Sequence, residues 1–228
     1  LLDIWQAQIY KIFGLSWKSL VIHASLMNSL YSVSIFIFLK KLNFNNLNSF
    51  VYSICAGLIM YPPAGTPTVE HHSLILSIIG FMCFVLGLKE SKKTYLIFSI
   101  IIFGISFFIK QVTTAYFVIL CIILYFSQIF MKINLGNFLL LFISTILVFF
   151  SLISFFLIKG VNLQDLVDQY LILSTSLGES RLSNIGWAQF YDNISKLFFL
   201  LFLIIPSFFI FLKFNKKKSF ILLFGLSV

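Results

Sequence analysis

The chain has 228 residues, of which 60% are hydrophobic and only 10% are charged. Soluble domains are about 45–50% apolar and about 25% charged, so this composition excludes a soluble domain and predicts an integral membrane protein. The formal net charge is +9, but most lysines stand at the ends of apolar runs. That placement is typical of cytoplasmic loops and excludes a basic face that binds nucleic acid.

Seven apolar runs and the start of an eighth follow one another, most of them near the length that crosses about 30 Å of hydrocarbon. They predict an all-α, polytopic helix bundle with about seven full spans and a truncated eighth. The predicted spans are residues 21–39, 45–61, 71–88, 93–109, 112–131, 138–158, 196–212 and 219–228. Since the chain begins at Leu1 and its last run stops at Val228, we expect a fragment. Residues 1–228 are expected to form a single transmembrane domain.

Lysine-rich segments follow every second span and set the predicted orientation, because loops on the cytoplasmic side are rich in Lys and Arg. These segments are residues 40–41, 89–93, 132 and 213–218. The loops that alternate with them are predicted to lie outside, with six of the seven acidic residues. They comprise residues 1–20, 62–70, 110–111 and 159–195.

Two outer segments have the pattern of amphipathic helices, which lie in the membrane interface rather than cross it. Residues 1–13 place their apolar side chains on one face, Gly14 follows as a stop, and Ser16 is expected to cap the next helix. Residues 163–173 also separate apolar from polar side chains, and Asn162 is their expected N-cap. Both helices are expected on the outer side.

The stretch MYPPAGTPTVEHHSLI, residues 60–75, holds three of the four prolines. Thr66 is expected to cap the following helix, with Pro67 at its first position. Glu70 then either stabilises the positive end of that helix or serves a cleft between helices. It shares one helical face with a series of small residues, which favours close helix packing. They are Ser73, Ser77, Gly80 and Gly87.

His71 and His72 are successive, so their side chains point about 100° apart on a helix. A helix that binds one metal ion usually offers ligands at i and i+4, so this pair does not suit one ion. Metal ligation by His71 and contact with lipid headgroups are both open hypotheses. Cys55, Cys83 and Cys121 lie in three different apolar runs and are interpreted as small buried hydrophobic residues.

Lys110 and Gln111 interrupt an apolar stretch and predict a tight outer turn, after which Thr113 or Thr114 caps the next helix. Lys110 is either a solvated turn residue or a cation that binds phosphate.

Arg181 is the only arginine in the chain. Its planar guanidinium suits phosphate or carboxylate in a two-bond contact that lysine cannot copy. A local pair with Glu179 is the alternative interpretation.

Three stretches resemble membrane glycosyltransferases of the GT-C type, the family 39-like enzymes related to protein mannosyltransferases and aminoarabinose transferases. They are LLDIWQAQIYKIFGLSWKSLVIHASLMNSLYSVSIFIFLKKL, YPPAGTPTVEHHSLILSIIGFMCFVLGLK and FGISFFIKQVTTAYFVIL. The resemblance covers residues 1–130 well and the remainder loosely. It implies transfer of a sugar from a polyprenyl-phosphate carrier to an acceptor glycan, lipid or protein. The active site would face the outer side of the membrane. The abundance of Lys, Asn, Ile and Phe predicts a bacterial protein, so this outer side is expected to be the periplasmic side of an inner membrane.

The resemblance also implies a catalytic acidic motif upstream of this chain, which leaves Glu70 and Asp3 as the candidate carboxylates here. A carboxylate base would deprotonate the acceptor, and cations would hold the departing phosphate. Lys110, Gln111 and Arg181 are the expected residues around that phosphate. No cofactor is required by the sequence, and a divalent metal stays open.

Two other classes of membrane protein stay open as alternatives. A transporter or lipid flippase would show interrupted helices and polar groups near mid-membrane, whereas polar residues here gather at the outer ends of the spans. An O-antigen-type polymerase or ligase shares lipid-linked sugars with the transferases. The sequence therefore favours the glycosyltransferase without excluding these two.

Overall fold

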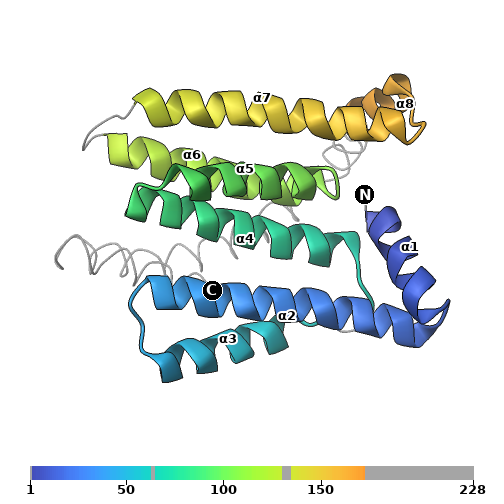
Figure 1. The fold of residues 1–228 in the computed structure, drawn as a ribbon, viewed down its shortest axis with the longest axis horizontal. Helices are drawn as coiled ribbons and strands as arrows, with labels where there is room; N and C mark the ends of the chain where they lie inside the picture. The colour runs from blue at the N-terminus through green and yellow to red at the C-terminus, as the bar shows by residue number, and fades with distance from the viewer. Residues whose placement is uncertain (1, 63–64, 130–134, 173–228) are drawn as a thin grey trace, which may run out of the picture. The chain divides into compact units, whose positions relative to one another are not determined.

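The computed structural model describes residues 2–62, 65–129 and 135–172, and within these ranges the regular structure is helical (Figure 1). The helices are α1 (Leu2–Phe13), α2 (Trp17–Lys41), α3 (Asn46–Met60), α4 (Val69–Glu90), α5 (Lys93–Phe107), α6 (Gln111–Ile129), α7 (Leu135–Ile158), α8 (Leu163–Val167) and the π-helix η1 (Asp168–Ile172). The predicted all-α class is therefore confirmed for the described residues.

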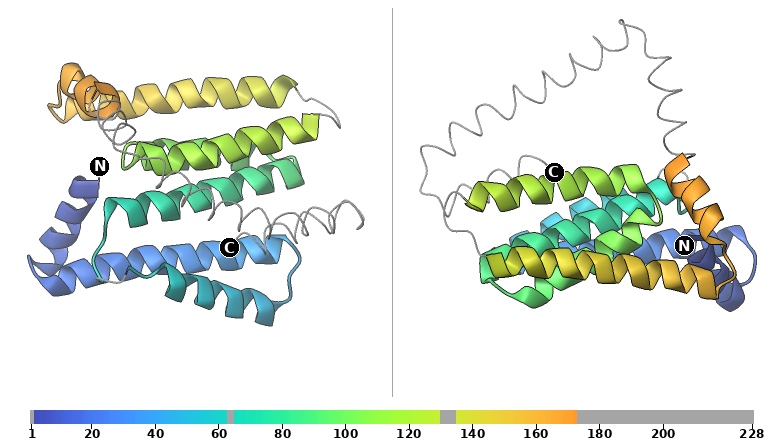
Figure 2. Two further views of the ribbon diagram at one scale, coloured as in Figure 1. Left: turned by 180° about the vertical axis from the view of Figure 1, so that it is seen from behind. Right: turned by 90° about the horizontal axis from the view of Figure 1, so that it is seen from above.

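The chain divides into two compact units, residues 1–161 and 162–228. The first unit contains α1 to α7, and the second contains α8 and η1. The single transmembrane domain stays a prediction. In the first unit α2 to α7 run side by side, with α1 crossing one end of α2 (Figures 1 and 2).

Three helical segments are long and apolar enough to cross a membrane: Trp17–Lys41, Val69–Glu90 and Gly136–Ile158. This finding supports the predicted membrane protein. The other apolar helices of the first unit, Asn46–Met60, Lys93–Phe107 and Gln111–Tyr125, are shorter than a usual span. The number of crossings therefore stays a prediction, and the last two predicted spans lie outside the described residues.

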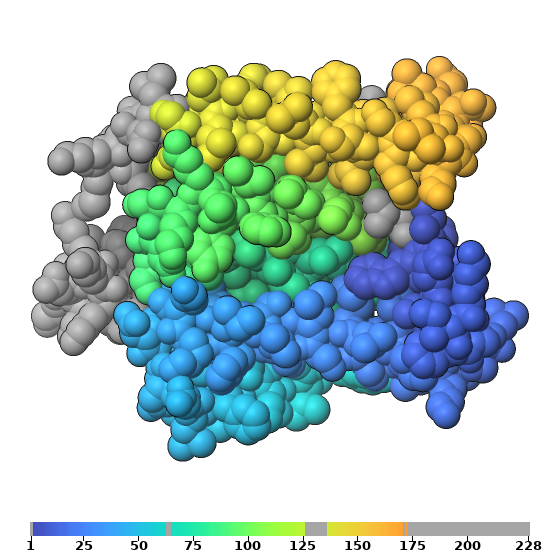
Figure 3. All heavy atoms as spheres, viewed as in Figure 1, coloured from blue at the N-terminus to red at the C-terminus, as the bar shows by residue number. Residues whose placement is uncertain are grey.

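The candidate spanning helices differ in how much protein covers them. The most apolar window of α4 is 72% buried, because α2, α5 and α6 pack around it. The corresponding window of α7 is only 6% buried, and Figure 3 shows α7, in yellow, open along its length on the face in view. In a bilayer, apolar side chains that no helix covers contact lipid. The first unit is thus organised around α4.

The start of α2 confirms the predicted turn. Gly14 has a positive φ of 77°, and its amide donates to the Tyr10 carbonyl at 2.8 Å, which ends α1. Ser16 then caps α2, since its hydroxyl accepts from the Ser19 amide at 3.3 Å. This arrangement brings α1 against α2.

The predicted start of α4 is wrong by two residues. The N-cap is Thr68 rather than Thr66, because the Thr68 hydroxyl accepts from the His71 amide at 3.1 Å. Pro67 therefore precedes the cap instead of opening the helix, and Glu70 lies in the first turn. The predicted small face is confirmed for Ser73, Ser77, Gly80 and Gly87, which are buried, whereas Glu70, predicted on the same face, is exposed.

The predicted cap of α6 is also wrong. Neither Thr113 nor Thr114 precedes the helix, which begins at Gln111 directly after Lys110. Thr114 lies inside the first turn and donates to the Lys110 carbonyl at 3.1 Å. A helical threonine can bond the carbonyl four residues earlier, so its hydroxyl does not need a capping position.

Two smaller predictions are only partly correct. Cys121 is buried, whereas Cys83 is half-buried and Cys55 is exposed, because Cys55 lies on the uncovered side of α3. Asn162 precedes α8 as expected, but its side chain makes no capping hydrogen bond.

Candidate functional site

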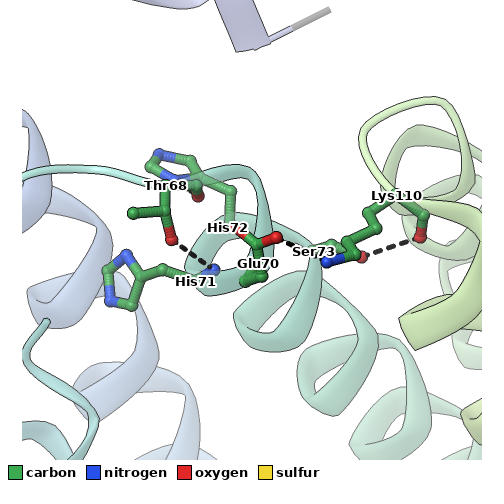
Figure 4. Close-up of polar contacts among 6 residues, drawn as sticks. All are labelled: Thr68, Glu70, His71, His72, Ser73 and Lys110. Atoms are coloured by element: carbon green, nitrogen blue, oxygen red, sulfur yellow. Dashed lines mark hydrogen bonds and ion pairs between the residues drawn. The ribbon is translucent and has the colours of Figure 1, made fainter.

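Glu70 and Lys110, which the sequence analysis treated separately, form an ion pair. The Lys110 Nζ lies 2.5 Å from the Glu70 Oε1. Glu70 belongs to the first turn of α4, and Lys110 stands in the turn between α5 and α6 (Figure 4). The side chains are 61% and 34% exposed, respectively. The pair therefore offers a carboxylate and an ammonium group together at one end of the helices.

A buried network of four hydroxyl groups lies next to this pair. The Ser106 hydroxyl, from α5, is 3.1 Å from that of Ser73 and 2.9 Å from that of Ser77, both on α4. It is also 2.8 Å from the Thr114 hydroxyl on α6. Ser73 and Thr114 each donate to the Lys110 carbonyl at 3.1 Å. The network joins three helices and fixes the backbone that carries Lys110.

An apolar cavity of about 510 Å³ borders the network. Its walls come mostly from α5, α6 and α7 and include Phe103, Phe107 and Phe142. Thr114 lines the cavity and also belongs to the network. Ser99, which is 1% exposed, lines it too, and its hydroxyl has no hydrogen-bond partner among the described residues. The cavity can receive a hydrocarbon chain but few polar groups.

His71 and His72 are buried, so the predicted contact with lipid headgroups is wrong. They are 6% and 0% exposed, because both rings contact polar side chains of α2. The amide nitrogen of Asn28 donates to the Gly57 carbonyl at 2.7 Å, which leaves its oxygen to accept from the His71 Nε2 at 2.9 Å. His72 instead contacts His23, with 3.0 Å between their Nε2 atoms.

The His23–His72 pair is covered by α1. The His23 Nδ1 contacts the Gln6 side-chain oxygen, and the His72 Nδ1 lies 3.0 Å from the Thr68 carbonyl. The Trp5 ring centroid is 5.5 Å from that of His23 and 5.7 Å from that of His72. This cluster joins α1, α2 and α4. His23 was not predicted, although an ionisable residue inside an apolar run is itself a signal of an interior position.

We expect His72→Leu to lower the free energy of unfolding by about 1–3 kcal/mol, because it leaves the buried His23 Nε2 without its partner. The double variant His23→Leu/His72→Leu should cost less than the sum of the two single changes. Thermal unfolding of the purified protein in detergent measures all three variants. If the losses in free energy of unfolding of the two single variants add up to that of the double variant, the two rings do not stabilise each other.

Among the other predicted site residues, Gln111 directly follows Lys110 as the first residue of α6. Asp3 is exposed on α1. Arg181 and Glu179 lie outside the described residues. The described ranges contain no group of three or more His, Cys, Asp or Glu side chains that could hold a metal ion. The Nε2 of His71 contacts Asn28, and metal ligation by His71 stays a prediction.

Comparisons with protein-family models, with curated proteins and with solved structures find no match to this chain.

Proposed function

We propose that this chain is a membrane glycosyltransferase that moves a sugar from a polyprenyl-phosphate carrier to an acceptor glycan, lipid or protein. The observation that supports this most is the Glu70–Lys110 pair, with its ion-pair distance of 2.5 Å and its partial exposure. A sugar-phosphate bond can break there beside a cation, and an acceptor can lose its proton to a carboxylate. The resemblance of residues 1–130 to GT-C enzymes points to the same chemistry.

In the proposed reaction Lys110 binds the phosphate of the carrier and thereby releases Glu70 from the ion pair. Glu70 accepts the proton of the acceptor hydroxyl or amine as that atom attacks the first carbon of the sugar. The bond from this carbon to the phosphate oxygen breaks, and its electrons stay on the phosphate. Lys110 stabilises the charge that develops on the departing polyprenyl phosphate. Gln111 and Arg181 are the further residues proposed around this phosphate.

The neighbouring cavity supports a lipid-linked donor. It is lined almost entirely by apolar side chains, and Thr114 connects it to the backbone of Lys110. A hydrocarbon chain in the cavity and a phosphate at Lys110 would thus belong to one molecule. The cavity volume of about 510 Å³ lies within the usual range of about 300–1,000 Å³ for ligand sites.

The proposed setting is a bacterial inner membrane with the Glu70–Lys110 pair on the periplasmic side. Seven crossings and a partial eighth, with residues 1–13 and 163–173 in the outer interface, complete the proposed topology. The described part of the chain supports this orientation. Lys40 and Lys41 end α2 and Lys89 lies in the last turn of α4, whereas Glu70 lies in the first turn of α4. Lysines near the cytoplasmic ends of spans are the usual pattern.

Donor turnover tests the proposed function. The full-length protein in lipid nanodiscs should release polyprenyl phosphate from at least one member of a panel of polyprenyl-phosphate-linked sugars. Thin-layer chromatography of the labelled lipid measures the release. Movement of the intact donor between leaflets, without cleavage of the sugar, would instead favour a flippase.

A further inference from the structure

Lysines gather at the end of the first unit opposite the Glu70–Lys110 pair. This lysine end is formed by Lys40 and Lys41 of α2, Lys89 and Glu90 of α4, Lys92, and Lys93 of α5. Figure 1 shows the ends of α2 and α4 and the start of α5 at the same end of the unit. Five lysines and one glutamate give this end a formal charge of +4. The Glu70–Lys110 pair at the other end is neutral as a pair.

Contacts between the helices hold the lysine end together. The Glu90 carboxylate lies 2.9 Å from the Lys92 Nζ and 3.6 Å from the Lys41 Nζ, so one acid is shared by two cations. The Lys89 Nζ donates to the Lys41 carbonyl at 2.5 Å. The hydrogen bond from Lys92 to Glu90 raises the pKa of Lys92. Glu90 offsets only one of the five positive charges.

Helix length places these lysines at the level of lipid headgroups. With 25 residues, α2 is about 37 Å long, and with 22 residues α4 is about 33 Å long, whereas the hydrocarbon layer is about 30 Å thick. Both helices are thus longer than the hydrocarbon layer, by about 7 Å and about 3 Å, so their lysine-bearing ends can reach the layer in which the phosphates lie. Lysine side chains can extend further into that layer while their stems stay on apolar surface.

Apolar side chains are exposed beside the same lysines. Leu47 and Phe50, in the first turns of α3, are 70% and 56% exposed, and Phe98, in the second turn of α5, is 58% exposed. A soluble anion bound to the lysines would not cover these apolar side chains. A phospholipid offers its phosphate to the lysines and its acyl chains to the apolar groups.

We propose that the lysine end binds anionic phospholipids through their headgroup phosphates and that Glu90 limits the strength of this binding. A lysine near an anionic membrane surface contributes about 1 kcal/mol, or about a fivefold change in affinity. Lys92 and Lys93 are adjacent at the start of α5, so one double variant removes two of the five positive charges. The site would anchor this end of the helices in the anionic leaflet.

Native mass spectrometry of the full-length protein in detergent tests the proposal by titration with phosphatidylglycerol and with phosphatidylcholine. Phosphatidylglycerol should bind more tightly than phosphatidylcholine. The variant Lys92→Gln/Lys93→Gln should bind phosphatidylglycerol about 25-fold more weakly. Glu90→Gln should bind it several-fold more tightly, because Lys41 and Lys92 are then no longer neutralised. The opposite sign of these two effects separates lipid binding from a loss of folding.

The matched control is Lys11→Gln/Lys18→Gln, which removes the same charge from exposed lysines of α1 and α2 near the other end. It should bind phosphatidylglycerol like the wild type. Equal binding of the two phospholipids, or an equal loss in the control, would overturn the proposal. If millimolar inorganic phosphate displaces phosphatidylglycerol, the lysine end binds a soluble anion rather than a phospholipid, and the proposal is overturned.

Discussion

Replacing Glu70 by glutamine is expected to slow sugar transfer by about a hundredfold or more, the usual contribution of a general base. Glutamine keeps the size of the side chain but cannot accept the proton of the acceptor. Folding should change little, because an ion pair as exposed as Glu70–Lys110 contributes about 0–1 kcal/mol. Turnover of a lipid-linked donor by the purified protein measures the effect.

Asp3→Asn is the control for this prediction, because Asp3 is an exposed carboxylate on α1 and the other acidic candidate in the described part of the chain. It should transfer sugar at nearly the wild-type rate. If Asp3→Asn is slow and Glu70→Gln is fast, the base has been assigned to the wrong residue. If Glu70→Gln is fast and the control is fast too, Glu70 serves only to start α4.

Replacing Lys110 by methionine is expected to lower the catalytic efficiency kcat/KM about tenfold to a hundredfold. Loss of one charge-assisted contact to phosphate costs about 1.5–3 kcal/mol, which corresponds to that range. Lys110→Arg should be milder, since a positive charge remains. The backbone of Lys110 should stay in place in both variants, because Ser73 and Thr114 bind its carbonyl rather than its side chain.

Lys18→Met is the matched control for Lys110→Met. Lys18 is also a lysine at a helix end, but it is exposed in the first turn of α2 and belongs to no proposed site. It should leave kcat/KM nearly unchanged. Equal losses in Lys18→Met and Lys110→Met would show that the total charge of the protein matters, and not a phosphate contact at Lys110.

The sequence was sufficient to place the helices of the first unit to within a few residues, because long apolar runs and their flanking lysines mark them. It also predicted the buried face of α4 from the spacing of Ser73 and Ser77. The helix starts were less accurate. Thr66 and Thr68 are both good capping residues, and only the position of the His71 amide selects Thr68.

The contacts between helices could not be predicted from one sequence. Glu70 and Lys110 are 40 residues apart, and their pairing depends on how the α5–α6 turn sits against the start of α4. His23 and His72 are 49 residues apart and meet only because α2 and α4 pack together. A periodic pattern indicates which face of a helix is buried but not which residue it meets.

Binding of the carrier lipid tests the central claim most directly, because it does not require the sugar to be known. Polyprenyl phosphate and the corresponding polyprenol differ only in the phosphate, and native mass spectrometry can compare them on the same protein. The comparison uses the variant Lys92→Gln/Lys93→Gln, which weakens the second phosphate site proposed at the lysine end. In this variant the account predicts that the phosphate binds more tightly than the alcohol and that adding Lys110→Met removes this preference. Equal binding of the two lipids, or a preference that survives the added Lys110→Met, would contradict the account.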